Sequence, residues 1–150
     1  MNLYRIAKTK YVNDLSGYGA FLYGGRWNEK SVHALYCSTS RPLAVLELLV
    51  HRTGGQLGIP DFSMIDLVVP DESILDKYDE SLQLLQEENS VAQQKLARSC
   101  FADHNVVGVR VASAILHQEA NVILNPNSHF HSQLVISEQY PIVLDSRLLA

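Results

Sequence analysis

Residues 17–28, which read GYGAFLYGGRWN, constrain the fold of this 150-residue chain more than any other segment. They contain four of its eight glycines, together with the aromatic residues Tyr18, Phe21, Tyr23 and Trp27. Glycine permits positive φ and a close approach of the backbone to a ligand, at an entropic cost. A segment that combines glycines with large rings is too apolar for an idle linker. We therefore predict an ordered loop with a function.

Arg26 lies between Gly25 and Trp27 in this loop. Its guanidinium is planar and always charged, and beside a stacking surface it suits a phosphate or a carboxylate. The structural alternative is a Gly-Gly turn in which Trp27 fills the core and Arg26 points to water. Such turns are common, so this stretch alone favours the alternative.

Composition limits the class of protein. A chain of 150 residues is long enough for one domain, 1–150, with a real core, and its 47% hydrophobic content excludes disorder. The net charge of −4 argues against nucleic-acid binding but allows one anionic small molecule. Two cysteines cannot form a disulfide framework. Without a signal peptide or a membrane-length apolar run, we expect a soluble cytoplasmic protein with no membrane contact.

Residues 43–51 predict a helix that carries a carboxylate. Ser40 and the residues before it offer an N-cap, Pro42 suits the first helical position, and Gly54-Gly55 marks the end. Apolar residues surround the axis, which is typical of a buried helix. Glu47 must then be paired, protonated or at the wall of a polar cavity, because an isolated buried charge is costly. A structural ion pair with an arginine and a cleft carboxylate both remain open.

Two more residues have a structural and a functional interpretation. Arg5 alternates with Tyr4 and Ile6 in a predicted strand, so it faces either solvent on an edge strand or a cleft. Ser113 follows a strand and lies among apolar residues, so it is either a buried serine bonded to backbone or a hydroxyl in the same cleft. His129 and His131 could share one face of a strand, but no third ligand is placed, so we predict no metal.

The remaining pattern predicts an α+β fold in which small mixed β-sheets pack around a cleft with flanking helices. Helices are expected within 81–100, with a break near 88–90 and a cap at Asn89 or Ser90. A turn is expected at 58–60. No dinucleotide-binding glycine motif or P-loop is present. Strands are predicted at 3–7, 34–38, 62–69, 106–111, 121–124, 134–137 and 142–144.

Taken together, five elements of this sequence resemble the RES-domain family, toxins of bacterial toxin–antitoxin pairs named for an arginine, a glutamate and a serine. The elements are LYRI around Arg5, GGRWN at 24–28, Tyr36, Glu47, and Ser113 followed by NVILNP. The resemblance runs from Leu3 to about Gln133. One departure is Ala112, where the family often has proline, which affects the conformation expected around Ser113.

The resemblance implies a fold like that of ADP-ribosyltransferase toxins. It implies that NAD⁺ is a substrate rather than a cofactor and that its nicotinamide–ribose bond is cleaved. A cognate Xre-type antitoxin would form a hetero-oligomer with the chain and block the active site. The implied catalytic residues are Glu47, Arg26 and Ser113, and the implied substrate-binding residues are Arg5, Arg26, Tyr36 and Ser113.

The implied residues suit that chemistry. Positive charge grows on the ribose as the bond breaks, and the cationic nicotinamide ring leaves without a general acid. One carboxylate, Glu47, would stabilise that charge, whereas ordinary glycosidases use two. Arg5 and Arg26 would bind the pyrophosphate, Tyr36 would wall the nicotinamide, and Ser113 would orient nicotinamide or ribose. Water and phosphate are both possible acceptors. Transfer of ADP-ribose to a protein and a non-catalytic binding module remain alternatives.

Overall fold

The computed structural model describes residues 1–51 and 61–149, within which seven strands form one mixed sheet in the order β4-β5-β6-β2-β1-β3-β7. The helix end expected at Gly54-Gly55 and the turn expected at 58–60 lie outside these residues. The strands are β1 (Asn2–Lys8), β2 (Leu35–Ser38), β3 (Phe62–Val68), β4 (Ile74–Asp76), β5 (Gly108–Ala112), β6 (Ala120–Leu124) and β7 (Val135–Pro141). The helices are α1 (Tyr18–Tyr23), α2 (Arg41–His51), α3 (Tyr78–Gln86) and α4 (Ser90–Phe101), with short 3₁₀ helices at Asp71–Ser73, His131–Gln133 and Ser146–Leu149.

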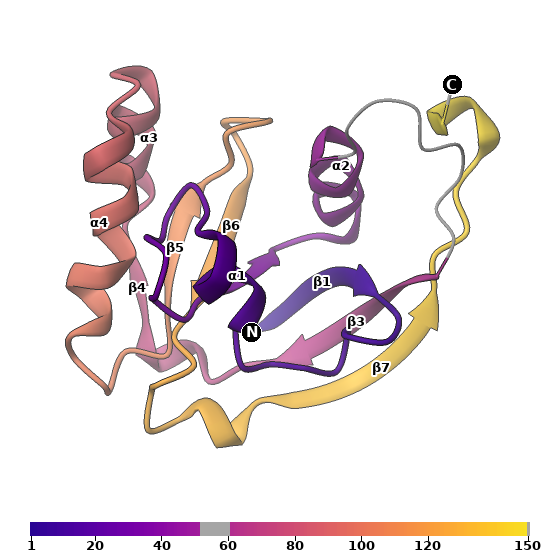
Figure 1. Ribbon diagram of the computed structural model, residues 1–150, viewed down its shortest axis with the longest axis horizontal. Helices are drawn as coiled ribbons and strands as arrows, with labels where there is room; N and C mark the ends of the chain where they lie inside the picture. Colours follow the sequence, from indigo (N-terminus) through magenta and orange to yellow (C-terminus); the bar gives the residue numbers. More distant parts are fainter. Residues whose placement is uncertain (52–60, 150) are drawn as a thin grey trace.

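The two small sheets expected from the sequence are in fact one sheet that is narrow at its middle. Strand β1 pairs with β3 along its whole length, from Asn2 opposite Val68 to Lys8 opposite Phe62. With β2 it pairs only through Tyr4 and Ser38, so the two strands part immediately beyond that pair. In Figure 1, α2 lies over the part of the sheet that contains β1, whereas α3 and α4 lie beside β4 and β5. A single sheet therefore carries two separate groups of helices.

The core has one apolar cluster on each face of this sheet. Alternation along β6 sends Val122 and Leu124 into one cluster and Ile123 into the other. Helix α4 packs on the second cluster through Leu96, Ala97 and Phe101. The Asn89 side chain caps this helix by accepting the Ala92 N–H at 3.1 Å, which confirms the predicted break and cap.

Two sequence predictions about loops and strands are wrong. The segment 17–28 is not a loop throughout, because α1 forms between Gly17 and Gly24, whose φ values of 71° and 69° let the chain enter and leave the helix. The strand expected at 142–144 is absent from the described structure. The Ile142 N–H binds the carbonyl of Phe62, the first residue of β3, at 3.0 Å. Beyond Ile142, the chain therefore has no further residue of β3 with which to pair.

The composition of helix α2 predicted burial on every side, and this prediction is wrong. Only Leu43 and Ala44 are buried, while Leu46 and Val50 are exposed, because one side of the helix covers the sheet and the rest faces a cleft and solvent. The helix begins at Arg41, one residue before Pro42, which was expected to take the first helical position, and the Ser40 hydroxyl accepts the Leu43 N–H at 3.3 Å.

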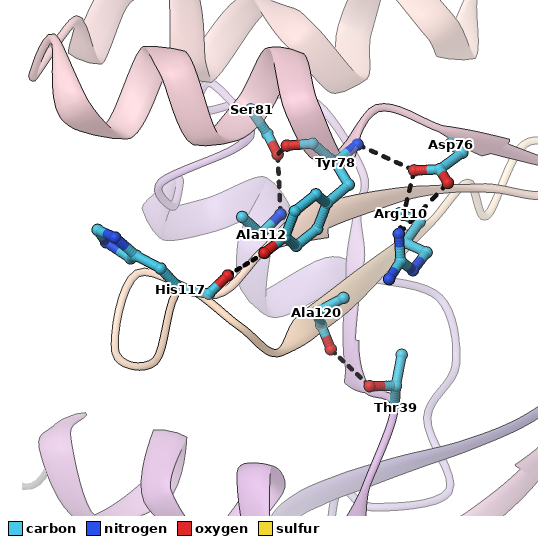
Figure 2. A network of polar contacts seen from close by, with 8 residues as sticks. All are labelled: Thr39, Asp76, Tyr78, Ser81, Arg110, Ala112, His117 and Ala120. Atoms are coloured by element: carbon cyan, nitrogen blue, oxygen red, sulfur yellow. Dashed lines mark hydrogen bonds and ion pairs between the residues drawn. The ribbon is translucent and has the colours of Figure 1, made fainter.

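Figure 2 shows how α3 holds the segment that follows β5. The Ser81 hydroxyl accepts the Ala112 N–H at 2.8 Å, and the Tyr78 hydroxyl donates to the His117 carbonyl. Arg110 on β5 pairs with Asp76 at 3.2 Å and lies over the Tyr78 ring. These contacts fix the loop that begins at residue 113. None of the helices in the described part of the chain has the length and apolarity needed to cross a membrane.

Candidate functional site

A cleft of about 740 Å³ opens over the middle of the sheet, between α2 and the glycine-rich segment that follows β1. Strands β1, β2 and β6 contribute to its floor, and the start of α4 and the loop after β5 contribute to its walls. Four of the predicted site residues line it, namely Arg5, Arg26, Tyr36 and Glu47. Ser113 is fully buried and contacts Glu47. Four of the five predicted residues therefore line one cleft, and the fifth, Ser113, is connected to it through Glu47.

Glu47 presents its carboxylate from α2, where 24% of the side chain is exposed. Oε1 accepts hydrogen bonds from Asn121 Nδ2 at 2.6 Å and from Ser113 Oγ at 3.2 Å. Oε2 lies 3.7 Å from Nε2 of His51, one helical turn further along. No arginine pairs with Glu47 among the described residues, so the geometry is that of a cleft carboxylate rather than a structural ion pair.

Ser113 acts on this carboxylate from the loop after β5. Its hydroxyl donates to Glu47 and accepts the backbone N–H groups of Ile115 and Leu116 at 3.1 and 3.3 Å. The loop closes where the Ser113 N–H meets the Glu119 carbonyl at 2.8 Å. With its hydroxyl committed in this way, Ser113 contributes to the cleft through Glu47. A direct contact of Ser113 with substrate stays a prediction.

Tyr36 holds the glycine-rich segment against β2. Its hydroxyl accepts the Trp27 N–H at 2.9 Å and donates to Asn28 Oδ1 at 2.7 Å. A Cβ atom at Gly25 would lie 2.5 Å from that hydroxyl oxygen, which explains why glycine occupies this position. Burial raises the pKa of Tyr36 to about 12, so the phenol is neutral at physiological pH.

Asn28 was not identified from the sequence, although the signal was present in GGRWN. The side chain is fully buried, and its Nδ2 lies 3.0 Å from each of the carbonyls of Ala20, Glu29 and Val32. Asn28 therefore organises the turn that carries Arg26. The buried Trp27 beside it fills the core, as the structural alternative for this segment proposed.

Arg26 is exposed and lies on the α4 side of the cleft. Its Nη1 donates to Oε1 of Gln93 at 3.3 Å, and Gln93, which is buried, donates in turn to the Leu84 carbonyl at 2.8 Å. No carboxylate pairs with Arg26 among the described residues. Its charge is therefore available to an anion in the cleft.

Arg5 lies in β1, an interior strand, so the edge-strand interpretation is wrong. Its Nη1 donates to the Val12 carbonyl at 2.8 Å. Burial lowers the pKa of Arg5, and the nearby Cys37 and Asp14 act in the opposite direction. Arg5 follows Tyr4, where β1 and β2 part, and there it contributes a second cation to the cleft lining.

The N-terminus of α2 is anchored to the sheet, which fixes the helix that carries Glu47. Arg41 pairs with the buried Asp66 on β3, and Tyr140 donates to the same carboxylate at 2.9 Å. The Arg41 guanidinium also lies over the Tyr4 ring, 4.6 Å from its centroid. Asp66 was not identified from the sequence, where a single acid inside the apolar run FSMIDLV was the available signal.

The histidines 129 and 131 do not form a strand pair. His131 begins a 3₁₀ helix, and the His129 ring instead lies edge-on to His104 at 5.7 Å. Within residues 1–51 and 61–149, no group of three His, Cys, Asp or Glu side chains is arranged to hold a metal ion.

Comparison with known proteins extends this description. The family model described as RES domain matches residues 2–145. A protein named Toxin Res from Photorhabdus laumondii is 37% identical over 99% of this chain and 97% of its own length. Another of that name, from Yersinia enterocolitica, is 31% identical over 99% of both chains. The Prs ADP-ribosylating toxin of a Sphingobium species is 46% identical over 66 residues, which make up 44% of this chain and 40% of that protein.

Proposed function

This chain belongs to the RES domain family, and proteins named Toxin Res are similar to it over nearly its whole length, so we propose that it is a toxin that destroys NAD⁺ by cleaving the nicotinamide–ribose bond. The chain would act as a single RES domain with an ADP-ribosyltransferase-like fold, in the cytoplasm where NAD⁺ is available. NAD⁺ is its substrate, and no cofactor is required.

One observation carries this proposal: among the described residues, the cleft is lined by one carboxylate and by two arginines that form no ion pair with a carboxylate. Glu47 lines the cleft with its Oε1 bonded to Asn121, and Arg5 and Arg26 line other parts of it. The arginines suit the pyrophosphate of NAD⁺, which carries two negative charges. Glu47 suits the ribose, where positive charge develops as the bond breaks.

In the proposed reaction the bond between ribose C1′ and the nicotinamide nitrogen breaks, and its electron pair leaves with nicotinamide. The ring was cationic in NAD⁺ and departs neutral, so no proton has to be donated to it. The cationic sugar is stabilised by the Glu47 carboxylate until an acceptor bonds to C1′. With water as the acceptor, one proton is released to solvent and the products are nicotinamide and ADP-ribose. With inorganic phosphate the second product is a phosphorylated ADP-ribose.

A toxin of this kind requires restraint, and we propose that a cognate Xre-type antitoxin supplies it in a hetero-oligomer. A carboxylate from the partner, placed between Arg5 and Arg26, would occupy the site of the pyrophosphate and exclude NAD⁺. Expression of the chain alone should arrest growth and deplete NAD⁺, and co-expression of the antitoxin should restore both. Normal growth and unchanged NAD⁺ with the folded chain present would contradict the toxin proposal.

The second candidate is an ADP-ribosyltransferase, which would use the same cleft with a protein as acceptor. The name of the Sphingobium relative, Prs ADP-ribosylating toxin, favours this candidate, although the similarity covers less than half of the chain. NAD⁺ labelled on its adenylate part separates the candidates when it is incubated with the purified chain, with and without phosphate or cell lysate. Small labelled products support hydrolysis or phosphorolysis, labelled protein supports transfer, and intact NAD⁺ in every mixture supports a non-catalytic binding module.

A further inference from the structure

We propose that Asn121 is a positioning residue that holds the Glu47 side chain by Oε1 and leaves Oε2 for the substrate. The inference rests on the proposed function, because it concerns how the NAD⁺-cleaving carboxylate is prepared. Asn121 lies on β6, is 9% exposed, and places Nδ2 2.6 Å from Glu47 Oε1. It contacts Glu47 across 74 residues of sequence, and no motif in the sequence pointed to this role.

Ser38 sets the orientation of the Asn121 amide. The two residues are opposite one another in the pairing of β2 with β6, and the Ser38 hydroxyl donates to Asn121 Oδ1 at 2.9 Å. A reversed amide would place its carbonyl oxygen 2.6 Å from a carboxylate oxygen, and two acceptors at that distance repel. The Ser38 hydroxyl therefore keeps the amide donor of Asn121 on Glu47 Oε1.

The same contacts determine which carboxylate oxygen is left to stabilise the ribose. Oε1 receives the hydrogen bonds of both Asn121 and Ser113, so its lone pairs are occupied. Oε2 has His51 at 3.7 Å on its own helix, and that imidazole is on an exposed side chain. Oε2 is thus the oxygen available to ribose. Among the residues that the structure describes, the other titratable side chains that line this cleft are those of Arg5, Arg26, Tyr4, Tyr23, Tyr36 and Cys37, so none of them adds a second carboxylate.

The test is Asn121→Asp, which replaces the donor with an acceptor and adds a negative charge beside Glu47. Like charges at this distance favour protonation of one carboxyl group. We expect kcat for NAD⁺ cleavage at neutral pH to fall by roughly 100-fold, with a much smaller change in KM, as a lost transition-state interaction requires. We also expect the acid side of the pH–rate profile to move to higher pH by about one unit or more.

Asn125→Asp is the matched control, because Asn125 is also buried, directly follows the same strand β6, and donates to the Val106 carbonyl at 3.2 Å, with no described hydrogen bond to Glu47. This variant should lose stability but keep the wild-type pH–rate profile. Ser38→Ala should weaken the orientation of the amide and lower kcat in the same direction as Asn121→Asp, by a smaller factor. If Asn121→Asp does not fold, the kcat of the Ser38→Ala variant is measured instead.

Failure of this inference is distinguishable from failure of the proposed function. Wild-type protein that leaves NAD⁺ intact would remove the proposed function itself. Wild-type protein that cleaves NAD⁺, combined with folded Asn121→Asp or Ser38→Ala variants of unchanged kcat and pH–rate profile, would overturn the positioning role alone.

Discussion

The hydroxyl of Tyr36 accepts the backbone N–H of Trp27 at 2.9 Å, so the strand under the cleft holds the chain that forms its wall. The same hydroxyl donates to Asn28, which in turn binds three carbonyls of the turn around it. A glycine-rich segment is costly to order, and these contacts order it. They place Arg26 at the cleft without any direct bond from Tyr36 to the guanidinium.

Tyr36→Phe should lower the free energy of unfolding by about 1–3 kcal/mol at neutral pH, because it removes a buried acceptor and a buried donor. Thermal or denaturant unfolding measures the change. Tyr11→Phe is the control, since Tyr11 is 55% exposed and no hydrogen bond of its hydroxyl is described. Equal stability of the Tyr36→Phe variant and wild type would show that the hydroxyl does not hold the segment.

The stability of the wild type should also fall at alkaline pH. The pKa of Tyr36 is raised to about 12 by burial, above its ordinary value of about 10, so the folded state retains a proton that the unfolded state releases. The stabilisation is complete below about pH 10 and is lost as the pH rises toward 12. Burial also raises the pKa of Cys37 to about 12, which adds a decline that Tyr36→Phe retains. Tyr36→Phe should therefore show a shallower decline than wild type, and an identical slope would contradict this assignment.

Gly25→Ala should distort the segment, because the added Cβ would lie 2.5 Å from the Tyr36 hydroxyl oxygen and 2.8 Å from Asn28 Oδ1. We expect a loss of stability and weaker NAD⁺ binding. Gly19→Ala provides the comparison in unfolding experiments, since nothing lies within 4 Å of its added Cβ and alanine favours the helix that contains it. If both variants unfold at the wild-type temperature, the steric requirement for glycine at position 25 is wrong.

Arg26→Lys should raise KM for NAD⁺ about tenfold, or ~1.4 kcal/mol, because lysine keeps the charge but lacks the planar pair of donors. It would also lose the contact with Gln93 that holds the guanidinium in place. Arg147→Lys is the control, as Arg147 is exposed in the C-terminal 3₁₀ helix and pairs only with Asp145 in the described structure. An unchanged KM in Arg26→Lys would transfer the phosphate role to Arg5.

The sequence predicted most elements of this fold because their signals are local. The cap at Asn89, the strands β1 and β3, and the helix that carries Glu47 all follow from neighbouring residues. The predicted small sheets are joined into one sheet by the single pair of Tyr4 and Ser38. No local sequence pattern predicts that pair. The exposure of α2 likewise depends on where the cleft opens.

Some residues of the candidate site were likewise predicted from the sequence, and others were found only in the structure. A family resemblance predicted Arg5, Arg26, Tyr36, Glu47 and Ser113. Four of them line one cleft, and Ser113 contacts Glu47. Asn121, Gln93 and Asp66 were not identified, because each acts on a residue far away in the sequence. A buried polar side chain in an apolar strand or helix marks such residues only in retrospect, since its partner is unknown until the chain is folded.

The central claim is that the Glu47 carboxylate stabilises the charge that develops when NAD⁺ is cleaved. The direct measurement is nicotinamide release by the purified wild type and by Glu47→Gln. Glutamine keeps a carbonyl oxygen that Asn121 and Ser113 can bind, so the fold and the affinity for NAD⁺ should change little. Loss of the carboxylate should slow turnover by about 100-fold to 1,000-fold or more. A Glu47→Gln variant that releases nicotinamide at the wild-type rate per folded molecule, whether or not its thermal stability is lower, would contradict the account.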